Sequence, residues 1–110
     1  MEKPDALLAL AALSQETRLD IFRTLVKAGG DGVRAGDLAR ALELKPNTLS
    51  VNLSQLLAAG LVRKTRDGRA VRYRADMDGM QRLLGFLMQD CCGGNPALCK
   101  PVLDEIACAC

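Results

Sequence analysis

All five cysteines of this 110-residue chain stand in its last twenty residues: Cys91, Cys92, Cys99, Cys108 and Cys110. A Gly-Gly-Asn-Pro stretch lies before Cys99 and allows the chain to fold Cys99 back towards the adjacent pair Cys91 and Cys92. Thiolates select soft, thiophilic ions. Three of them suit the pyramidal, three-bond geometry of trivalent arsenic or antimony better than the tetrahedral geometry of structural zinc. We therefore expect Cys91, Cys92 and Cys99 to bind such an ion.

The last two cysteines leave several alternatives open. Cys108 and Cys110 can complete a four-ligand site for cadmium, lead or zinc, form an auxiliary arsenic site, or belong to a disordered tail. The simplest alternative for the whole segment is that its cysteines are small hydrophobic residues in a loose tail.

An enzyme that works through these thiols is the rival class. Reactive cysteines usually lie at a helix N-terminus or beside a cation, whereas Cys91 and Cys92 follow a predicted helix at its negative end and beside Asp90. The chain has no histidine and no nucleotide-binding glycine motif. We therefore expect no enzyme, and in particular no thiol oxidoreductase. A redox sensor that forms disulfides among these thiols stays open as an alternative.

The length predicts one compact domain, and the composition predicts a mainly helical one. Hydrophobic residues make up 49% of the chain but aromatic residues only 3%, and Ala and Leu dominate. No apolar run is long enough to cross a bilayer. We therefore expect a cytoplasmic protein with no membrane partner, in which thiols stay reduced and a disulfide framework does not form.

Charge is distributed unevenly along the chain. Six of the fifteen Lys and Arg residues fall within positions 63–74, whereas positions 75–110 carry five acids against two bases. This asymmetry predicts a basic contact surface followed by a separate, acidic and cysteine-rich segment.

Apolar spacing predicts about five helices and a two-stranded hairpin. The first helix starts at Pro4, the second is capped by Ser14, the third spans about Ala35 to Leu42, the fourth starts at Pro46, and the last follows position 77. Asp67-Gly68 predicts a tight hairpin between two short strands. The inward-facing residues are expected to be Leu19, Phe22, Leu25 and Val26 in the second helix, and Leu49, Leu53, Leu56 and Leu57 in the fourth.

The third and fourth helices have the proportions of a helix-turn-helix, whose second helix enters the major groove of DNA. Its outer face is uncharged but rich in amides and hydroxyls. We expect Asn47, Thr48, Val51, Asn52 and Gln55 to contact bases, and Lys45 and Ser50 to contact phosphates. The alternative is an ordinary solvated face.

The predicted hairpin makes DNA binding the favoured interpretation. We expect its cations to contact the phosphate backbone: Arg63, Lys64, Arg66, Arg69, Arg72 and Arg74. Arg63 and Arg74 have an alternative role, which is to pair with acids such as Asp76.

The runs ETRLDIF, LSVNLSQLLAAGLV and RDGRAVRYR resemble the ArsR/SmtB family of metal-sensing winged helix-turn-helix repressors, and the resemblance extends over about residues 6–90. It implies a homodimer, joined through its first and last helices, that covers an inverted repeat in double-stranded operator DNA and leaves when its inducer binds. The corresponding interface residues here are Leu7, Leu10, Met80, Leu84, Gly85 and Leu87. Residues 1–90 would then form the DNA-binding and dimerisation domain, and residues 91–110 the inducer-binding segment.

The resemblance also narrows the inducer. A Cys-x-Cys sensor site in the third helix is absent, because Val33-Arg34-Ala35 stands there. The zinc-type site on the last helix needs histidines, which this chain lacks. Some arsenite-responsive members carry a CC…C site after the last helix, so the resemblance implies As(III) or Sb(III) as inducer. A cadmium-sensing, lead-sensing or redox-sensing repressor of the same fold remains the alternative.

Two residues depart from the family pattern. Many members have a histidine where Asn52 stands and a basic residue where Val51 stands, which leaves the operator sequence open.

Overall fold

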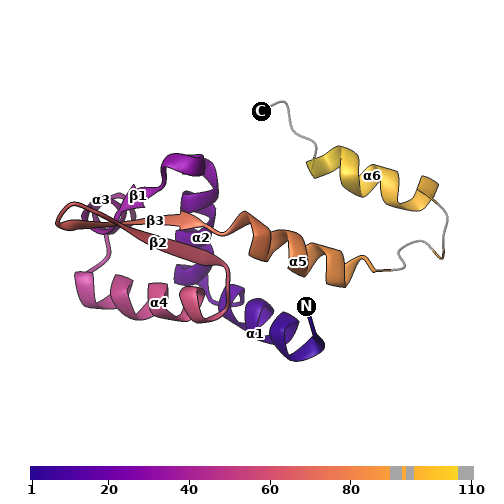
Figure 1. Ribbon diagram of the computed structural model, residues 1–110, viewed down its shortest axis with the longest axis horizontal. Helices are drawn as coiled ribbons and strands as arrows, with labels where there is room; N and C mark the ends of the chain where they lie inside the picture. Colours follow the sequence, from indigo (N-terminus) through magenta and orange to yellow (C-terminus); the bar gives the residue numbers. More distant parts are fainter. Residues whose placement is uncertain (90–92, 94–95, 107–110) are drawn as a thin grey trace.

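The computed structural model describes residues 1–89, 93 and 96–106. Its elements follow the order α1 (Lys3–Leu13), α2 (Glu16–Ala28), the 3-10 turn η1 (Gly29–Asp31), β1 (Val33–Arg34), α3 (Ala35–Leu42), α4 (Pro46–Ala58), β2 (Val62–Asp67), β3 (Ala70–Ala75), α5 (Met77–Leu87) and α6 (Pro96–Ile106) (Figure 1). The mainly helical, winged helix-turn-helix fold is therefore confirmed. Three elements were not predicted: the 3-10 turn η1, strand β1 and helix α6.

The core forms where α2, α4 and the base of the sheet meet. Its fully buried side chains include Ile21 and Leu25 of α2, Leu38 of α3, and Leu53 and Leu56 of α4. Each such side chain contributes about 1.5–3 kcal/mol when it leaves water. The four leucines expected to face inward on α4 do so, although Leu57 is only partly buried.

Helix α1 packs through its alanines and exposes its leucines. Ala6, Ala9 and Ala12 are buried, and these small side chains let the helix axis approach the core closely. Leu7 and Leu10 are 59% and 40% exposed. The leucine face of α1 is thus left for contacts outside the described chain.

The prediction for α2 was partly wrong. Phe22 and Leu25 are buried with Ile21, but Leu19 and Val26 lie at the edge of this face and are each 42% exposed. The N-cap is Gln15, whose side-chain oxygen accepts from the backbone N–H of Arg18 at 2.8 Å. Ser14 instead donates its hydroxyl to the carbonyl of Ala11, at the end of α1.

The wing is a three-stranded antiparallel sheet in the order β1-β3-β2, where two strands had been predicted. Strands β2 and β3 pair from Val62 with Ala75 to Asp67 with Ala70. Gly68 opens the turn between them with a φ of 65°, a conformation that favours glycine. The third strand, β1, pairs only Val33 and Arg34 with β3, and two residues are too short to give a periodic signal.

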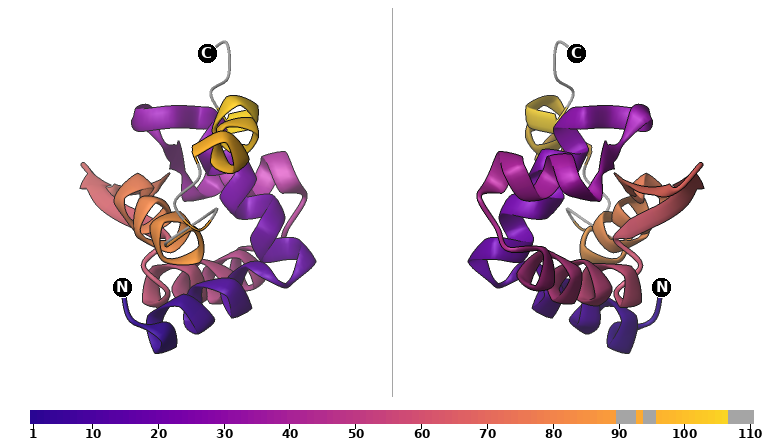
Figure 2. Two further views of the ribbon diagram at one scale, coloured as in Figure 1. Left: turned by 90° about the vertical axis from the view of Figure 1, so that its right-hand side faces the viewer. Right: turned by 90° about the vertical axis from the view of Figure 1, so that its left-hand side faces the viewer.

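Helix α5 leaves the sheet and extends away from it, and α6 turns back so that it lies over the far part of α5 (Figures 1 and 2). Gly79 and Leu83 form the buried side of α5. Met80 is partly buried against the core, whereas Leu84, Gly85 and Leu87 are exposed. In the part of the chain that the structure describes, no helix is long and apolar enough to cross a membrane.

A close backbone contact fixes the start of α5 against the end of α4. A Cβ atom added to Gly79 would lie 1.9 Å from the carbonyl oxygen of Gly60. Because this oxygen is a backbone atom, it cannot move away by a change of side-chain rotamer. Gly79→Ala should therefore lower the free energy of unfolding by about 1–3 kcal/mol, the usual cost of overpacking. Urea denaturation measures this directly.

Gly36→Ala is the matched control, because the nearest neighbour of an added Cβ in α3 is a flexible atom of Arg40 at 3.7 Å. Alanine at this helical position should raise the free energy of unfolding by up to about 1 kcal/mol. Equal effects of the two substitutions would contradict the assigned contact.

Candidate nucleic-acid interface and cysteine site

The outer face of α4 presents most of the predicted base-contacting residues to solvent. Glu43 adopts a left-handed φ of 54° and ends α3, so that α4 restarts after two residues with Lys45 as its N-cap. The exposed predicted residues are Lys45, Asn47, Thr48, Ser50, Val51 and Gln55. Val51 is 60% exposed, and its methyl groups are available for contact with a thymine methyl group.

Asn52 is the exception, and its predicted place on the outer face was wrong. Its side chain is 9% exposed. The amide Nδ2 donates to the carbonyl of Thr48 at 2.8 Å, and Oδ1 accepts from Nη1 of Arg18 at 3.3 Å. The nitrogen and the oxygen of the Asn52 side chain both form hydrogen bonds within the protein. Asn52 therefore holds α4 in place and does not offer its amide to a base edge.

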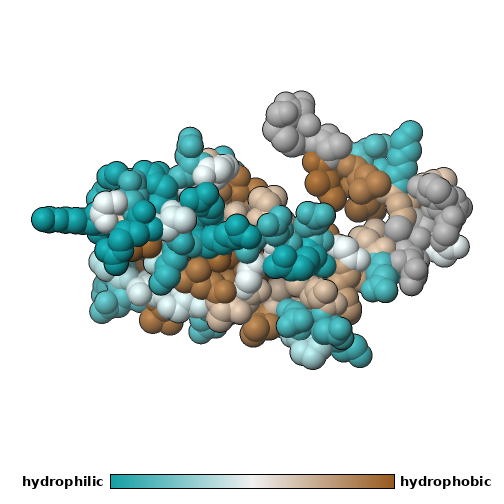
Figure 3. Space-filling view, in the orientation of Figure 1, coloured by the Kyte–Doolittle hydropathy of each residue, from teal (hydrophilic) through white to brown (hydrophobic). Residues whose placement is uncertain are grey.

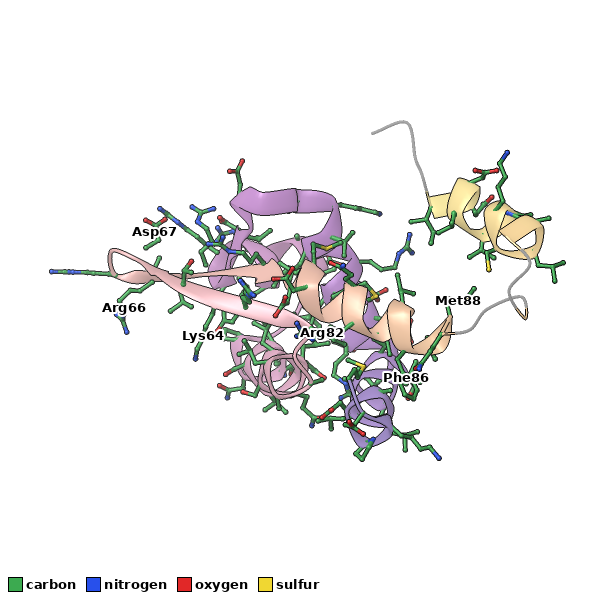
Figure 4. The ribbon with its side chains drawn as sticks, turned by 45° about the vertical axis from the view of Figure 1, so that its right-hand side comes forward. Lys64, Arg66, Asp67, Arg82, Phe86 and Met88 are labelled. Carbon is green, nitrogen blue, oxygen red and sulfur yellow. The ribbon has the colours of Figure 1, made fainter. Side chains whose placement is uncertain are left out.

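The wing carries a group of cations that are not used for internal ion pairs. Lys64, Arg66 and Arg69 are exposed, and none of them forms a salt bridge with another described residue. Lys64 and Arg66 project to the same side of the hairpin, towards the side on which α4 lies (Figure 4). Strand alternation places residues two apart on one face. Lys64 and Arg66, both of which are predicted to contact phosphates, therefore lie on one face of β2.

Arg72, which is predicted to contact phosphates, also makes contacts within the protein. Its guanidinium pairs with Asp67 at 3.1 Å and donates to the carbonyl of Asp31 at 3.1 Å. Arg34 pairs with the same carboxylate at 3.2 Å. The hydrogen bonds from Arg72 and Arg34 hold the pKa of Asp67 below its usual value. Arg72 therefore joins strand β3 to η1, and the two arginines around the single carboxylate of Asp67 leave a net positive charge there.

The alternative role predicted for Arg63 is confirmed. Its Nε lies 3.2 Å from Asp76 and its Nη2 lies 3.2 Å from Asp78. Asp76 caps α5, because Oδ1 accepts from the backbone N–H of Gly79 at 3.0 Å. Arg74 donates to the hydroxyl of Thr65 rather than to Asp76. The wing and the start of α5 are thus joined through Arg63, which pairs with both carboxylates.

Cys99 is the one predicted sulfur ligand that lies within the described residues. It is buried, at 9% exposure, in the first half of α6. Its sulfur is part of a disulfide bond, contrary to the expectation that the thiols stay reduced. Cys91, Cys92, Cys108 and Cys110 lie outside the described residues. Among the residues that are described, no three potential ligands gather closely enough to hold a metal ion.

Cys99 borders an apolar groove of about 380 Å³ between α5 and α6. Leu84, Leu87 and Met88 line one wall, and Val102 and Leu103 line the other. Hydrophobic residues gather over α6, while the wing end of the molecule is hydrophilic (Figure 3). Because Met88 and Cys99 border the same groove, the chain brings Cys99 back to the end of α5, as the predicted thiol site requires.

A solvent-facing helix at the end of a helix-turn-helix, flanked by a cationic hairpin, defines a winged helix-turn-helix protein. A family model described as a helix-turn-helix domain matches residues 13–65. The nodulation protein NolR of Rhizobium meliloti is 35% identical over 78 residues, and a putative arsenical resistance operon repressor ArsR of Halobacterium salinarum is 37% identical over 70 residues. These matches cover 71% and 64% of this chain, and they span 62% and 54% of the two relatives.

Solved structures extend the similarity over the whole fold. HlyU from Vibrio cholerae shares 32% identity, with 79% of this chain and 97% of that chain covered and a TM-score of 0.63. An ArsR-like transcriptional regulator from Rhodococcus sp. RHA1 shares 28% identity over 97% of this chain and 96% of that one, with a TM-score of 0.71.

A third structure, the winged helix-turn-helix domain of Mb0332 from Mycobacterium bovis, is described as homodimeric and as a possible ArsR-family regulator. It shares 26% identity over 77% of this chain and 76% of that one, with a TM-score of 0.65. The chain belongs to the ArsR family of winged helix-turn-helix transcriptional regulators. This membership agrees with the expectation that it is not an enzyme.

The carboxylate that joins the wing to α5 predicts a specific acid sensitivity. Burial raises the pKa of Asp76, but hydrogen bonds from Gly79 and Arg63 outweigh burial and hold the pKa below its usual value. The stability that this carboxylate contributes is therefore present above its unfolded-state pKa and is lost as the pH falls through the lower folded-state value.

Asp76→Asn keeps the acceptor for Gly79 and removes only the charge, while Asp76→Ala also removes the cap and should cost about 0.5–2 kcal/mol at pH 7. In urea denaturation between pH 2 and 7, the gap between wild type and Asp76→Asn should narrow as the pH falls below about 4. A gap that stays constant over this range would show that the ionised carboxylate contributes nothing.

Proposed function

We propose that this protein is a DNA-binding transcriptional repressor that reads operator DNA with α4 and holds the phosphate backbone with the wing. One observation carries this proposal: the exposed, uncharged face of α4 lies beside Lys64, Arg66 and Arg69, whose charges are free of internal salt bridges in the described structure. An uncharged reading face next to unpaired cations separates base contacts from phosphate contacts. An ordinary solvent-exposed helix face would not require unpaired cations next to an uncharged surface.

The repressor acts as a homodimer on an inverted repeat with half-sites about one helical turn apart. Two observations support dimerisation. The related Mb0332 domain is described as homodimeric, and helices α1 and α5 both expose apolar residues. These are Leu7 and Leu10 on α1, and Leu84 and Leu87 on α5. Gly85, which has open space around it, allows close approach of a second α5.

The inducer in this proposal is trivalent arsenic or antimony, held by Cys91, Cys92 and Cys99. Three protonated thiols and one arsenous acid form three As–S bonds and release three water molecules, with no change in oxidation state. The position of Cys99 beside Met88 supports the site, because binding would tie α6 to the end of α5. The disulfide at Cys99 must first be reduced to two thiols by an external dithiol, which is itself oxidised to a disulfide. Cys108 and Cys110 are potential auxiliary ligands.

Release of DNA needs only a moderate coupling between the two sites. A hundredfold loss of operator affinity corresponds to about 2.7 kcal/mol, within the usual range for allosteric ligands. Helix α5 carries Leu84 and Leu87 of the proposed dimer contact and ends next to the proposed thiol site. Fixing its end therefore changes how the two α4 helices are spaced on DNA.

A thiol-redox repressor is the second candidate, and the disulfide at Cys99 favours it. Oxidation of two thiols by a peroxide forms the S–S bond, consumes one peroxide and releases two water molecules. In this candidate the oxidised and reduced forms of the same cysteines, rather than a bound ion, set the position of α6. A cadmium or lead sensor would need a fourth sulfur from Cys108 or Cys110.

The proposed division of contacts predicts the salt dependence of binding. Arg66→Gln and Arg69→Gln each remove two phosphate contacts from a dimer, so the slope of log K against log salt should become shallower by about 1.8. Lys27→Gln, which removes an exposed cation at the end of α2, should leave the slope unchanged. Fluorescence anisotropy with promoter DNA at several salt concentrations gives these slopes, and an unchanged slope in both wing variants would exclude the wing from the interface.

Serine substitutions separate the inducer candidates. Cys91→Ser, Cys92→Ser and Cys99→Ser should each bind promoter DNA as the wild type does but fail to release it with arsenite under reducing conditions, because serine oxygen does not replace a thiolate for a soft ion. Arsenite release that persists in all three variants would contradict the site. Release by peroxide alone, lost in Cys99→Ser, would favour the redox candidate.

A further inference from the structure

Arg18 occupies an unusual electrostatic position for a surface-helix arginine. It lies in the first turn of α2, where the helix dipole disfavours a cation. Its side chain is half-buried, yet it forms no salt bridge with any described residue. A cation that is partly removed from water without a carboxylate partner needs other strong contacts to hold it there.

Those contacts are two neutral oxygens on two other helices. Nε of Arg18 donates to the carbonyl of Ala12 at 2.7 Å, in the last turn of α1. That carbonyl is one of four at a helix end that lack an intrahelical donor, and it lies at the negative end of the α1 dipole. Nη1 of Arg18 donates to Oδ1 of Asn52 on α4 at 3.3 Å. One guanidinium thus spans α1, α2 and α4.

Asn52 connects the hydrogen bond from Arg18 to the turn of α4 that carries exposed residues. Its Nδ2 donates to the carbonyl of Thr48, one turn earlier. Thr48, one turn before Asn52, and Val51, the residue next to Asn52, are both exposed. Rotation of α4 about its axis would break the bond from Arg18 and would move both exposed side chains together. The core leucines restrain the rotation of α4 less strictly than this hydrogen bond does, because apolar contacts have no preferred direction.

We propose that Arg18 and Asn52 form a positioning pair that sets the rotation of α4 and thereby the base discrimination of the protein. This inference rests on the proposed DNA-binding function and deepens it, because it assigns specificity to two residues that touch no DNA. It also gives α1, whose exposed leucines belong to the proposed dimer contact, a direct polar connection to the reading helix. A bidentate reach of this kind requires arginine, since a lysine ammonium is a single point charge.

The test compares binding to a labelled promoter fragment from upstream of the protein's own gene with binding to a scrambled fragment of equal length. Arg18→Met and Asn52→Leu should each reduce the ratio of the two affinities about tenfold, the cost of roughly one misplaced base contact. Affinity for the scrambled fragment and the salt slope should stay unchanged. The double variant should lose no more than either single variant, because both break the same connection.

Two further variants keep the outcome interpretable. Arg23→Met removes another exposed α2 cation, one with no salt bridge among the described residues, and should leave the ratio unchanged. Arg18→Lys keeps the charge but cannot span both oxygens, so its ratio should also fall; it covers the case in which Asn52→Leu does not fold. A wild-type ratio in Arg18→Lys would overturn the proposal. So would a shallower salt slope in Arg18→Met, which would indicate a direct phosphate contact.

Failure of the proposed function gives a different result. If the wild type shows no preference for promoter DNA, the repressor assignment fails before any variant is compared. The pair itself is then tested without DNA by NMR, in which the Asn52 side-chain amide protons should exchange slowly with solvent and should exchange faster in Arg18→Met. Fast exchange in the wild type would overturn the positioning pair independently.

Discussion

The packing of α4 against α2 is the constraint on which the rest of the structure depends. Leu49, Leu53 and Leu56 bury one side of α4 against a face that includes Ile21 and Leu25. Because α4 is amphipathic, burial of its leucine face leaves its amide-rich and hydroxyl-rich face exposed to solvent. The bond from Arg18 to Asn52 then adds direction to a contact that is otherwise only apolar. The buried leucines and this bond together determine which side of α4 faces solvent.

Two polar junctions connect this reading surface to the remaining elements. Asp67 pairs with both Arg34 and Arg72, which connects the short strand β1 to the β2–β3 hairpin. Asp76 both caps α5 and pairs with Arg63 of β2, and Gly79 packs against the backbone at Gly60. The helix that leads to the cysteines is therefore tightly joined to the wing at its start. Its far end, beside Cys99, is where a bound ion or a disulfide can act on it.

The sequence predicted elements with strong local signals and missed those that depend on pairing. The helix over Ala35–Leu42 and the hairpin at Asp67-Gly68 follow from periodicity and turn chemistry. Asn52 was placed outside because it is polar, although it lies three residues after Leu49 and four before Leu56, on the same helical face. The pairing of Arg72 with Asp67 depends on cross-strand geometry. Helix α6 contains Pro101, which is disfavoured in a helix interior.

The central claim is that one chain couples thiol chemistry near Cys99 to DNA held by α4 and the wing. The most direct measurement is fluorescence anisotropy of wild-type protein with a labelled promoter fragment, first fully reduced and then titrated separately with arsenite, antimonite, cadmium, zinc and peroxide. We expect the reduced protein to bind the promoter fragment tightly and to release it when arsenite or antimonite is added. No binding of the promoter fragment, or binding that none of the five reagents reverses, would contradict it.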